Sequence, residues 1–112
     1  MDQNESQRDR ASRVARELSG ALRRRARVRW TQVKTSQRNE GRRHVWRFQD
    51  GAAGEQRYLY VTHQALASGE STVPQLMEQL EAGHWLDRLN AGPETSLVLS
   101  AGGRLQAGPP RA

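Results

Sequence analysis

Apolar residues recur at three- and four-residue spacing near the start of the chain. Val14, Leu18 and Leu22 follow this period within Ser6–Arg25, and the period is typical of a helix with one narrow apolar stripe. Gly20 interrupts the pattern, at a cost of ~1 kcal/mol relative to alanine. The pattern therefore predicts an N-terminal helix over Ser6–Arg25, which packs along one edge or against a partner chain.

A period of two replaces the helical spacing from Ala26 onward, as in half-buried strands. Alternating, β-branched and aromatic residues predict three strands, over Arg27–Thr35, His44–Gln49 and Arg57–Thr62. A polar turn over Ser36–Arg42 and a second turn rich in glycine separate them. Because such short connections force neighbouring strands to run antiparallel, the sequence predicts a three-stranded antiparallel meander.

Alternation also assigns side chains to the two faces of this meander. The face expected to be buried carries the larger apolar residues, Val28, Trp30, Trp46, Phe48, Leu59 and Val61. The opposite face is more polar and carries Arg27, Arg29, Val45, Arg47, Tyr58 and Tyr60. Lys34 joins this second face only if the first strand is bulged or twisted. The sequence thus predicts a basic sheet surface with two tyrosines.

The second half of the chain returns to short helical segments. Capping residues and apolar spacing predict helical turns over His63–Ala67, Pro74–Glu81 and His84–Leu89. Thr95–Ser100 is predicted to be a strand that extends the sheet, and Arg104–Gln106 is the candidate for a short returning strand. The order α-β-β-β-α-β predicts an α+β fold.

The chain is expected to fold as one unit. Its 112 residues fit a single domain, and residues 10–106 are predicted to form it. The two ends are polar and poor in large apolar side chains. Residues 1–9 and 107–112 are therefore predicted to be disordered.

Several classes of function lack the residues that they require. The chain has no cysteine, which excludes disulfides and thiol chemistry. Its three histidines, His44, His63 and His84, stand on different predicted elements without the close spacing of metal ligands. No serine lies in the turn of a catalytic nucleophile. No metal site, no cofactor and no enzymatic activity are expected.

Membrane association is not expected either. No segment approaches the ~20 apolar residues of a membrane span. The N-terminus has no apolar stretch resembling a signal peptide. The expected location is the cytoplasm.

Positive charge is concentrated in one stretch of a chain whose net charge is +6. Residues 23–47 hold ten basic residues and one acid, which gives a net charge of +9. Basic side chains placed among aromatic ones can neutralise phosphates and stack against bases. The candidate anion-binding residues are Arg23, Arg24, Arg25, Arg27, Arg29, Lys34, Arg38, Arg42, Arg43 and Arg47, together with Tyr58 and Tyr60.

Two classes of nucleic-acid-binding domain share parts of this pattern. The α-β-β-β-α order over Ser6–Leu89 is similar in topology to a double-stranded-RNA-binding domain, in which two helices pack on one face of a three-stranded sheet. That family's basic cluster is missing, because residues 71–75 read Ser-Thr-Val-Pro-Gln. Trp46-Arg47-Phe48 and Arg57-Tyr58 resemble the small sheet-based DNA readers of the AP2 and integrase amino-terminal type. The chain is assigned to neither family.

These observations favour a small non-enzymatic binding module whose basic sheet face engages a polyanion, with nucleic acid as the first candidate. The alternative is a protein-interaction module, with the arginine-rich surface solvated or contacting an acidic protein. That alternative includes a homodimer formed through the N-terminal helix or through Ser96–Ser100, which is expected to be an edge strand.

Overall fold

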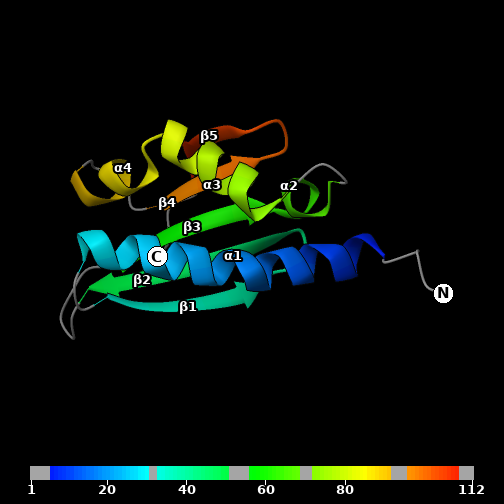
Figure 1. The fold of residues 1–112 in the computed structure, drawn as a ribbon, viewed down its shortest axis with the longest axis horizontal. Coiled ribbons are helices and arrows are strands. Elements are labelled where there is room, and N and C mark those ends of the chain that lie inside the picture. Colours follow the sequence, from blue (N-terminus) through cyan, green and yellow to red (C-terminus); the bar gives the residue numbers. More distant parts are fainter. Residues whose placement is uncertain (1–5, 31–32, 51–55, 69–71, 92–95, 109–112) are drawn as a thin grey trace.

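In the part of the chain that the structure describes, four helices lie on one face of a five-stranded sheet (Figure 1). The computed structural model describes residues 6–30, 33–50, 56–68, 72–91 and 96–108. In chain order the elements are α1 (Gln7–Arg29), β1 (Val33–Asn39), β2 (Arg43–Asp50), β3 (Gln56–Thr62), α2 (His63–Ala67), α3 (Val73–Ala82), α4 (Trp85–Ala91), β4 (Ser96–Ser100) and β5 (Arg104–Ala107). The predicted α+β class is confirmed.

Helix α1 is four residues longer at its C-terminal end than the sequence predicts. The side chain of Ser6 caps its start, because Ser6 Oγ accepts a hydrogen bond of 3.1 Å from the Asp9 backbone N–H. The apolar stripe continues past Leu22 to Ala26, which is fully buried, and residues 26–29 contain no glycine or proline. Arg27 and Arg29 are therefore helical, and their predicted place on a strand is wrong.

Strand β1 consequently begins later than predicted and uses residues assigned to the turn. Ser36, Gln37, Arg38 and Asn39 pair with β2 from Arg47 to His44, and only residues 40–42 connect the two strands. The prediction failed because β1 is an edge strand, in which polar side chains face solvent and hide the alternation. In the turn, Gly41 has a φ of 88° and donates its backbone N–H to Asn39 Oδ1.

The sheet order is β1-β2-β3-β4-β5, and only β3 and β4 pair in parallel. The predicted antiparallel meander is confirmed as β1-β2-β3. A parallel neighbour requires a crossover connection, which α2, α3 and α4 supply. Strand β4 lies between β3 and β5, so the prediction that Ser96–Ser100 forms an edge strand is wrong.

The core lies between the helices and one face of the sheet. Trp46, Phe48, Leu59 and Val61 are buried there as predicted, and so is Trp30. Each tryptophan of this core donates its indole N–H to a polar side chain: Trp46 to Ser19 Oγ at 2.8 Å, Trp30 to Asn90 Oδ1 at 2.9 Å, and Trp85 to Glu81 Oε2 at 3.0 Å.

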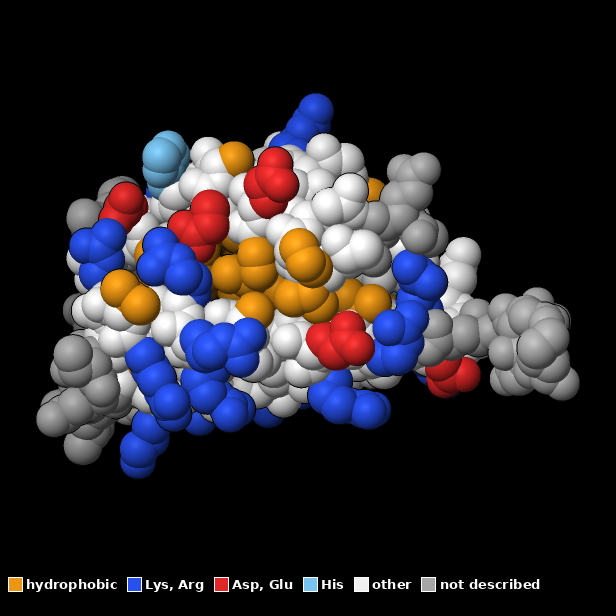
Figure 2. Space-filling view, viewed as in Figure 1, with side chains coloured by type: hydrophobic (Ala, Val, Ile, Leu, Met, Phe, Trp, Pro, Cys, Tyr) orange, Lys and Arg blue, Asp and Glu red, His pale blue; other side chains and the backbone are white. Residues whose placement is uncertain are grey.

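Val28, predicted to be buried, is 73% exposed because it follows Arg27 on the solvent side of α1. Apolar side chains are also visible at the surface between α1 and α3 (Figure 2). Val73 and Met77 of α3 are half-buried against the core. Among the described residues, no helix is both long and apolar enough to cross a bilayer.

The two ends of the domain differ from the predicted boundaries. Residues 7–9 form the first turn of α1, and Ala107 ends β5. The Gly108 backbone N–H also donates to Ser96 O at 2.9 Å, which continues the pairing with β4 by one residue. The remaining residues of the two predicted disordered ends, except Ser6, lie outside the described residues.

The bond between Ser19 and Trp46 gives a test of this packing. Replacement of Ser19 by alanine leaves the buried indole N–H without its partner, which costs about 1–3 kcal/mol. The Ser19→Ala change also gains up to ~0.5 kcal/mol in helix propensity, and Ser12→Ala on the same helix measures that gain separately. We expect urea unfolding to place Ser19→Ala about 1–2 kcal/mol below Ser12→Ala in free energy of unfolding. Equal stability of the two variants would contradict this packing role.

Candidate functional site

The face of the sheet opposite the helices carries the candidate site. Strand pairing places side chains of this face in rows across the sheet, because paired residues point to the same side. One row joins Ser36, Arg47, Tyr58 and Ser96, and the next joins Arg38, Val45, Tyr60, Val98 and Gln106. A third row joins Lys34, Gln49 and Gln56. We call this surface, formed by these rows and the ends of the same strands, the open sheet face.

Five basic residues project from the open sheet face: Lys34, Arg38, Arg43, Arg47 and Arg104. The rows of this face contain no aspartate or glutamate among the described residues, and the nearest acid in the adjoining turn, Glu40, is paired with Arg43. Lys34 reaches this face without a bulge, because β1 begins at Val33 and its register differs from the predicted one. A surface with charge of one sign attracts anions over several ångströms beyond contact distance.

The two tyrosines of this face have different environments. Tyr60 is only 1% exposed, and the Arg43 guanidinium lies 4.2 Å from the centre of its ring. Arg43 also donates to Glu40 Oε1 at 3.3 Å. Tyr58 is partly exposed, and its hydroxyl donates to Gln56 Oε1. Of the two predicted binding tyrosines, only Tyr58 offers its ring to a ligand.

A shallow hollow lies beside Tyr58 on this face. Its volume is about 320 Å³, and it is lined by Ser36, Gln37, Arg38, Val45, Arg47 and Tyr58. Arg38 and Arg47 are both exposed and come from neighbouring strands. Two guanidinium groups at the margin of a partly apolar hollow suit a ligand with a flat apolar part and negative charges.

Arg25 and Arg29, both predicted to bind an anion, form ion pairs within the protein. Arg25 donates two hydrogen bonds to the Glu81 carboxylate, at 2.8 and 3.0 Å, and so joins α1 to α3. These bonds to Arg25 lower the pKa of Glu81 and raise the pKa of Arg25. Arg29 forms an ion pair with Asp87 of α4. These two arginines therefore stabilise helix packing.

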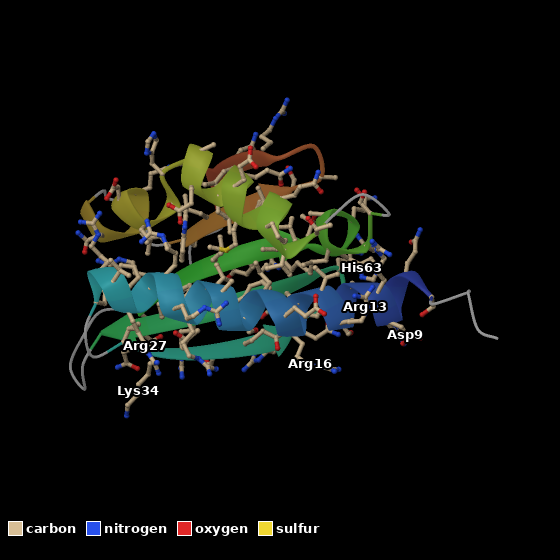
Figure 3. All side chains as sticks on the ribbon, in the orientation of Figure 1. Asp9, Arg13, Arg16, Arg27, Lys34 and His63 are labelled. Carbon is tan, nitrogen blue, oxygen red and sulfur yellow. The ribbon has the colours of Figure 1, made fainter. Side chains whose placement is uncertain are left out.

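The remaining predicted residues lie on other surfaces. Arg23, Arg24 and Arg27 are exposed on α1, and Arg42 is exposed in the turn between β1 and β2. Figure 3 shows Arg16 and Arg27 projecting from α1, whereas Lys34 comes from β1. The ten basic residues thus divide among α1, the turn and the open sheet face. Arg104 was missed because it lies far from the basic block and joins the surface only through pairing of β5 with β4.

A second hollow, of about 360 Å³, lies where the start of α1 meets the β1–β2 turn and the start of α2. It is lined by Arg8, Asp9, Ser12, Asn39, Gly41, His44 and His63. Two histidines and a carboxylate line it, but no group of three metal-ligating side chains is found among the described residues. Sequence reasoning treated these histidines as separate, because only the fold brings residues 44 and 63 together.

His44 is the buried titratable group of this second hollow. It is 3% exposed, and this burial, together with the nearby His63, lowers its pKa. Gln37 Nε2 lies 2.7 Å from His44 Nδ1. An amide nitrogen is only a donor, so the ring nitrogen accepts in this arrangement, which fits the lowered pKa of His44.

Comparison of the chain with protein-family models, curated proteins and solved structures finds no match.

The lowered pKa of His44 predicts a loss of stability in mild acid. The unfolded chain binds a proton at His44 near pH 6.5, whereas the folded protein resists it to a lower pH. The contribution of His44 is therefore complete above about pH 6.5 and decreases as the pH falls below it. We expect denaturant unfolding to show a lower free energy at about pH 5.5 than at about pH 7.5.

A histidine pair provides the control for that prediction. His44→Leu removes the buried proton acceptor. The free energy of unfolding should then change less between these two pH values. His84 is exposed and has a φ of 56°, and asparagine tolerates that backbone conformation. His84→Asn should leave the pH dependence intact, and an equal effect of both changes would contradict the assignment to His44. His63, Arg8 and Asp9 line the same hollow and remain in place in both variants.

Proposed function

We propose that the protein is a binding module that holds nucleic acid on its open sheet face. The observation that carries this proposal is the arrangement of Lys34, Arg38 and Arg47 around the exposed part of Tyr58. No acidic side chain lies among the described residues of that face. Arginines bind phosphates in a bidentate manner, and an aromatic ring offers a surface for a base.

The outer surface of α1 is the other basic candidate, and its composition is less suited to nucleic acid. Its arginines are mixed with Asp9 and Glu17, and Arg13 lies 3.9 Å from Glu17 in an i,i+4 ion pair. Acids placed between the bases reduce the attraction to phosphate. No aromatic side chain lies within α1. The open sheet face therefore supports the proposal better.

The two surfaces predicted to form a homodimer already pack against other parts of the same chain. The apolar stripe of α1 packs on the sheet, and Val14, Leu18 and Leu22 are buried there. Strand β4 has a neighbour on each side. An acidic protein remains the competing ligand for the basic face, and the experiment below separates it from nucleic acid.

Two charge-matched triple variants test the proposal. Lys34→Gln/Arg38→Gln/Arg47→Gln removes three cations from the open sheet face. Arg16→Gln/Arg23→Gln/Arg27→Gln removes three from the exposed side of α1. Both changes lower the formal net charge from +6 to +3. We expect the first to weaken binding of a labelled oligonucleotide by about tenfold or more, and the second to change it by less than about threefold.

The salt dependence of binding provides a second measurement. Loss of three phosphate contacts should reduce the slope of log affinity against log salt concentration by about two for a single strand. Fluorescence anisotropy between about 50 and 200 mM salt measures that slope. Equal losses in both variants would show that only net charge matters. No binding to any oligonucleotide at low salt, with binding to an acidic polypeptide, would replace nucleic acid by a protein ligand.

A further inference from the structure

The width of the open sheet face limits the form of nucleic acid that it fits. Five strands at a spacing of ~4.8 Å give a surface about 19 Å wide across the strands. The major groove of B-form DNA is about 12 Å wide and admits one helix or a two-stranded ribbon. This face is therefore too broad to enter the groove. A duplex would touch it with phosphates alone and would leave Tyr58 without a base.

A hydrogen bond links Tyr58 to a neighbour on its own strand. Gln56 is two residues before Tyr58 on the same face of β3, about 7 Å along the strand. The Tyr58 hydroxyl donates to Gln56 Oε1 at 2.5 Å, which joins these two neighbouring side chains. Tyr58 is partly exposed, and a base can stack on the exposed part of an aromatic ring.

The surroundings of Tyr58 provide room and charge for one nucleotide. The hollow beside it has a volume of about 320 Å³, which lies at the lower end of the range for small-ligand sites. Arg47 is the direct cross-strand neighbour of Tyr58, and Arg38 comes from the next row. A second base cannot stack on Tyr60, because its ring is buried and the Arg43 guanidinium lies over it.

We infer that the open sheet face takes single-stranded nucleic acid, with one base stacked on Tyr58 and the adjoining phosphates on Arg47 and Arg38. This inference rests on the proposed function and narrows its ligand to unpaired strands. Any base can stack on an aromatic side chain. The affinity for a nucleic acid should therefore depend more on whether its bases are unpaired than on their sequence.

The test measures the affinity of the wild type and two Tyr58 variants for several nucleic-acid ligands. The ligands are labelled mixed-sequence strands of roughly 12 nucleotides, as DNA and as RNA, the corresponding duplexes, and a strand of the same length made of abasic deoxyribose phosphates. The proteins are the wild type, Tyr58→Leu, which removes the ring, and Tyr58→Phe, which keeps it. The DNA and RNA strands show whether the 2′-hydroxyl matters.

We expect the wild-type protein to bind single strands at least tenfold more tightly than duplexes. Tyr58→Leu should lose about 5- to 100-fold in affinity for the single strand, and Tyr58→Phe less than about threefold. The affinity of the wild type for the abasic strand should be as low as the affinity of Tyr58→Leu for the natural strand. The wild type and Tyr58→Leu should bind the abasic strand equally. The abasic comparison also tests stacking in the wild type if Tyr58→Leu fails to fold.

Different results would overturn this inference and the proposed function. Equal affinity for strands and duplexes, with no effect of Tyr58→Leu, would overturn the stacking assignment. The triple variant of the open sheet face would still weaken binding in that case, and the proposed function would stand. If no strand, abasic strand or duplex binds at low salt, both proposals fail.

Discussion

The packing of α1 on the sheet is the contact on which the rest of the structure depends. Its buried stripe contains three alanines, Ala11, Ala15 and Ala26, and such small side chains let the helix approach the sheet closely. The stripe also includes Leu18 and Leu22, and Ser19 lies beside it, bonded to the indole of Trp46. All four described helices share one core with this contact. They therefore cover the same face of the sheet, whereas Lys34, Arg38 and Arg47 on the opposite face are exposed.

Much of this arrangement could be predicted from the sequence, because β2 and β3 are half-buried and alternate clearly. The alternation predicts that Arg47 and Tyr58 share one face, and their pairing across β2 and β3 confirms this. The end of α1 could not be predicted in the same way. Arg27-Val28-Arg29 alternates like a strand, but arginine also has a high helix propensity, and burial of Ala26 favours the helix. As a result Lys34 and Arg38 occupy the sheet positions that had been assigned to Arg27 and Arg29.

The use of each arginine depends on contacts between distant residues. Arg25 and Arg29 meet Glu81 and Asp87, which follow them by 56 and 58 residues. Glu81 also accepts the Trp85 indole N–H, so one carboxylate joins α1, α3 and α4. No local pattern in the sequence records such a pairing. A count of charges within residues 23–47 therefore overstates the number of basic residues on this face of the sheet, and it misses Arg104 outside that range.

Tyr58 and Tyr60 show how position in the sheet decides the use of a side chain. Both lie on β3 and point to the same face, so alternation alone predicts the same exposure for both. The row of Tyr60 places Val45 and Val98 on either side of it, and Arg43 covers its ring. The row of Tyr58 has Arg47 and Ser96 as its neighbours. Tyr60 is buried in its row, whereas Tyr58 is partly exposed beside the exposed Arg47. The site that we propose for a flat anionic ligand lies at the boundary between these two rows.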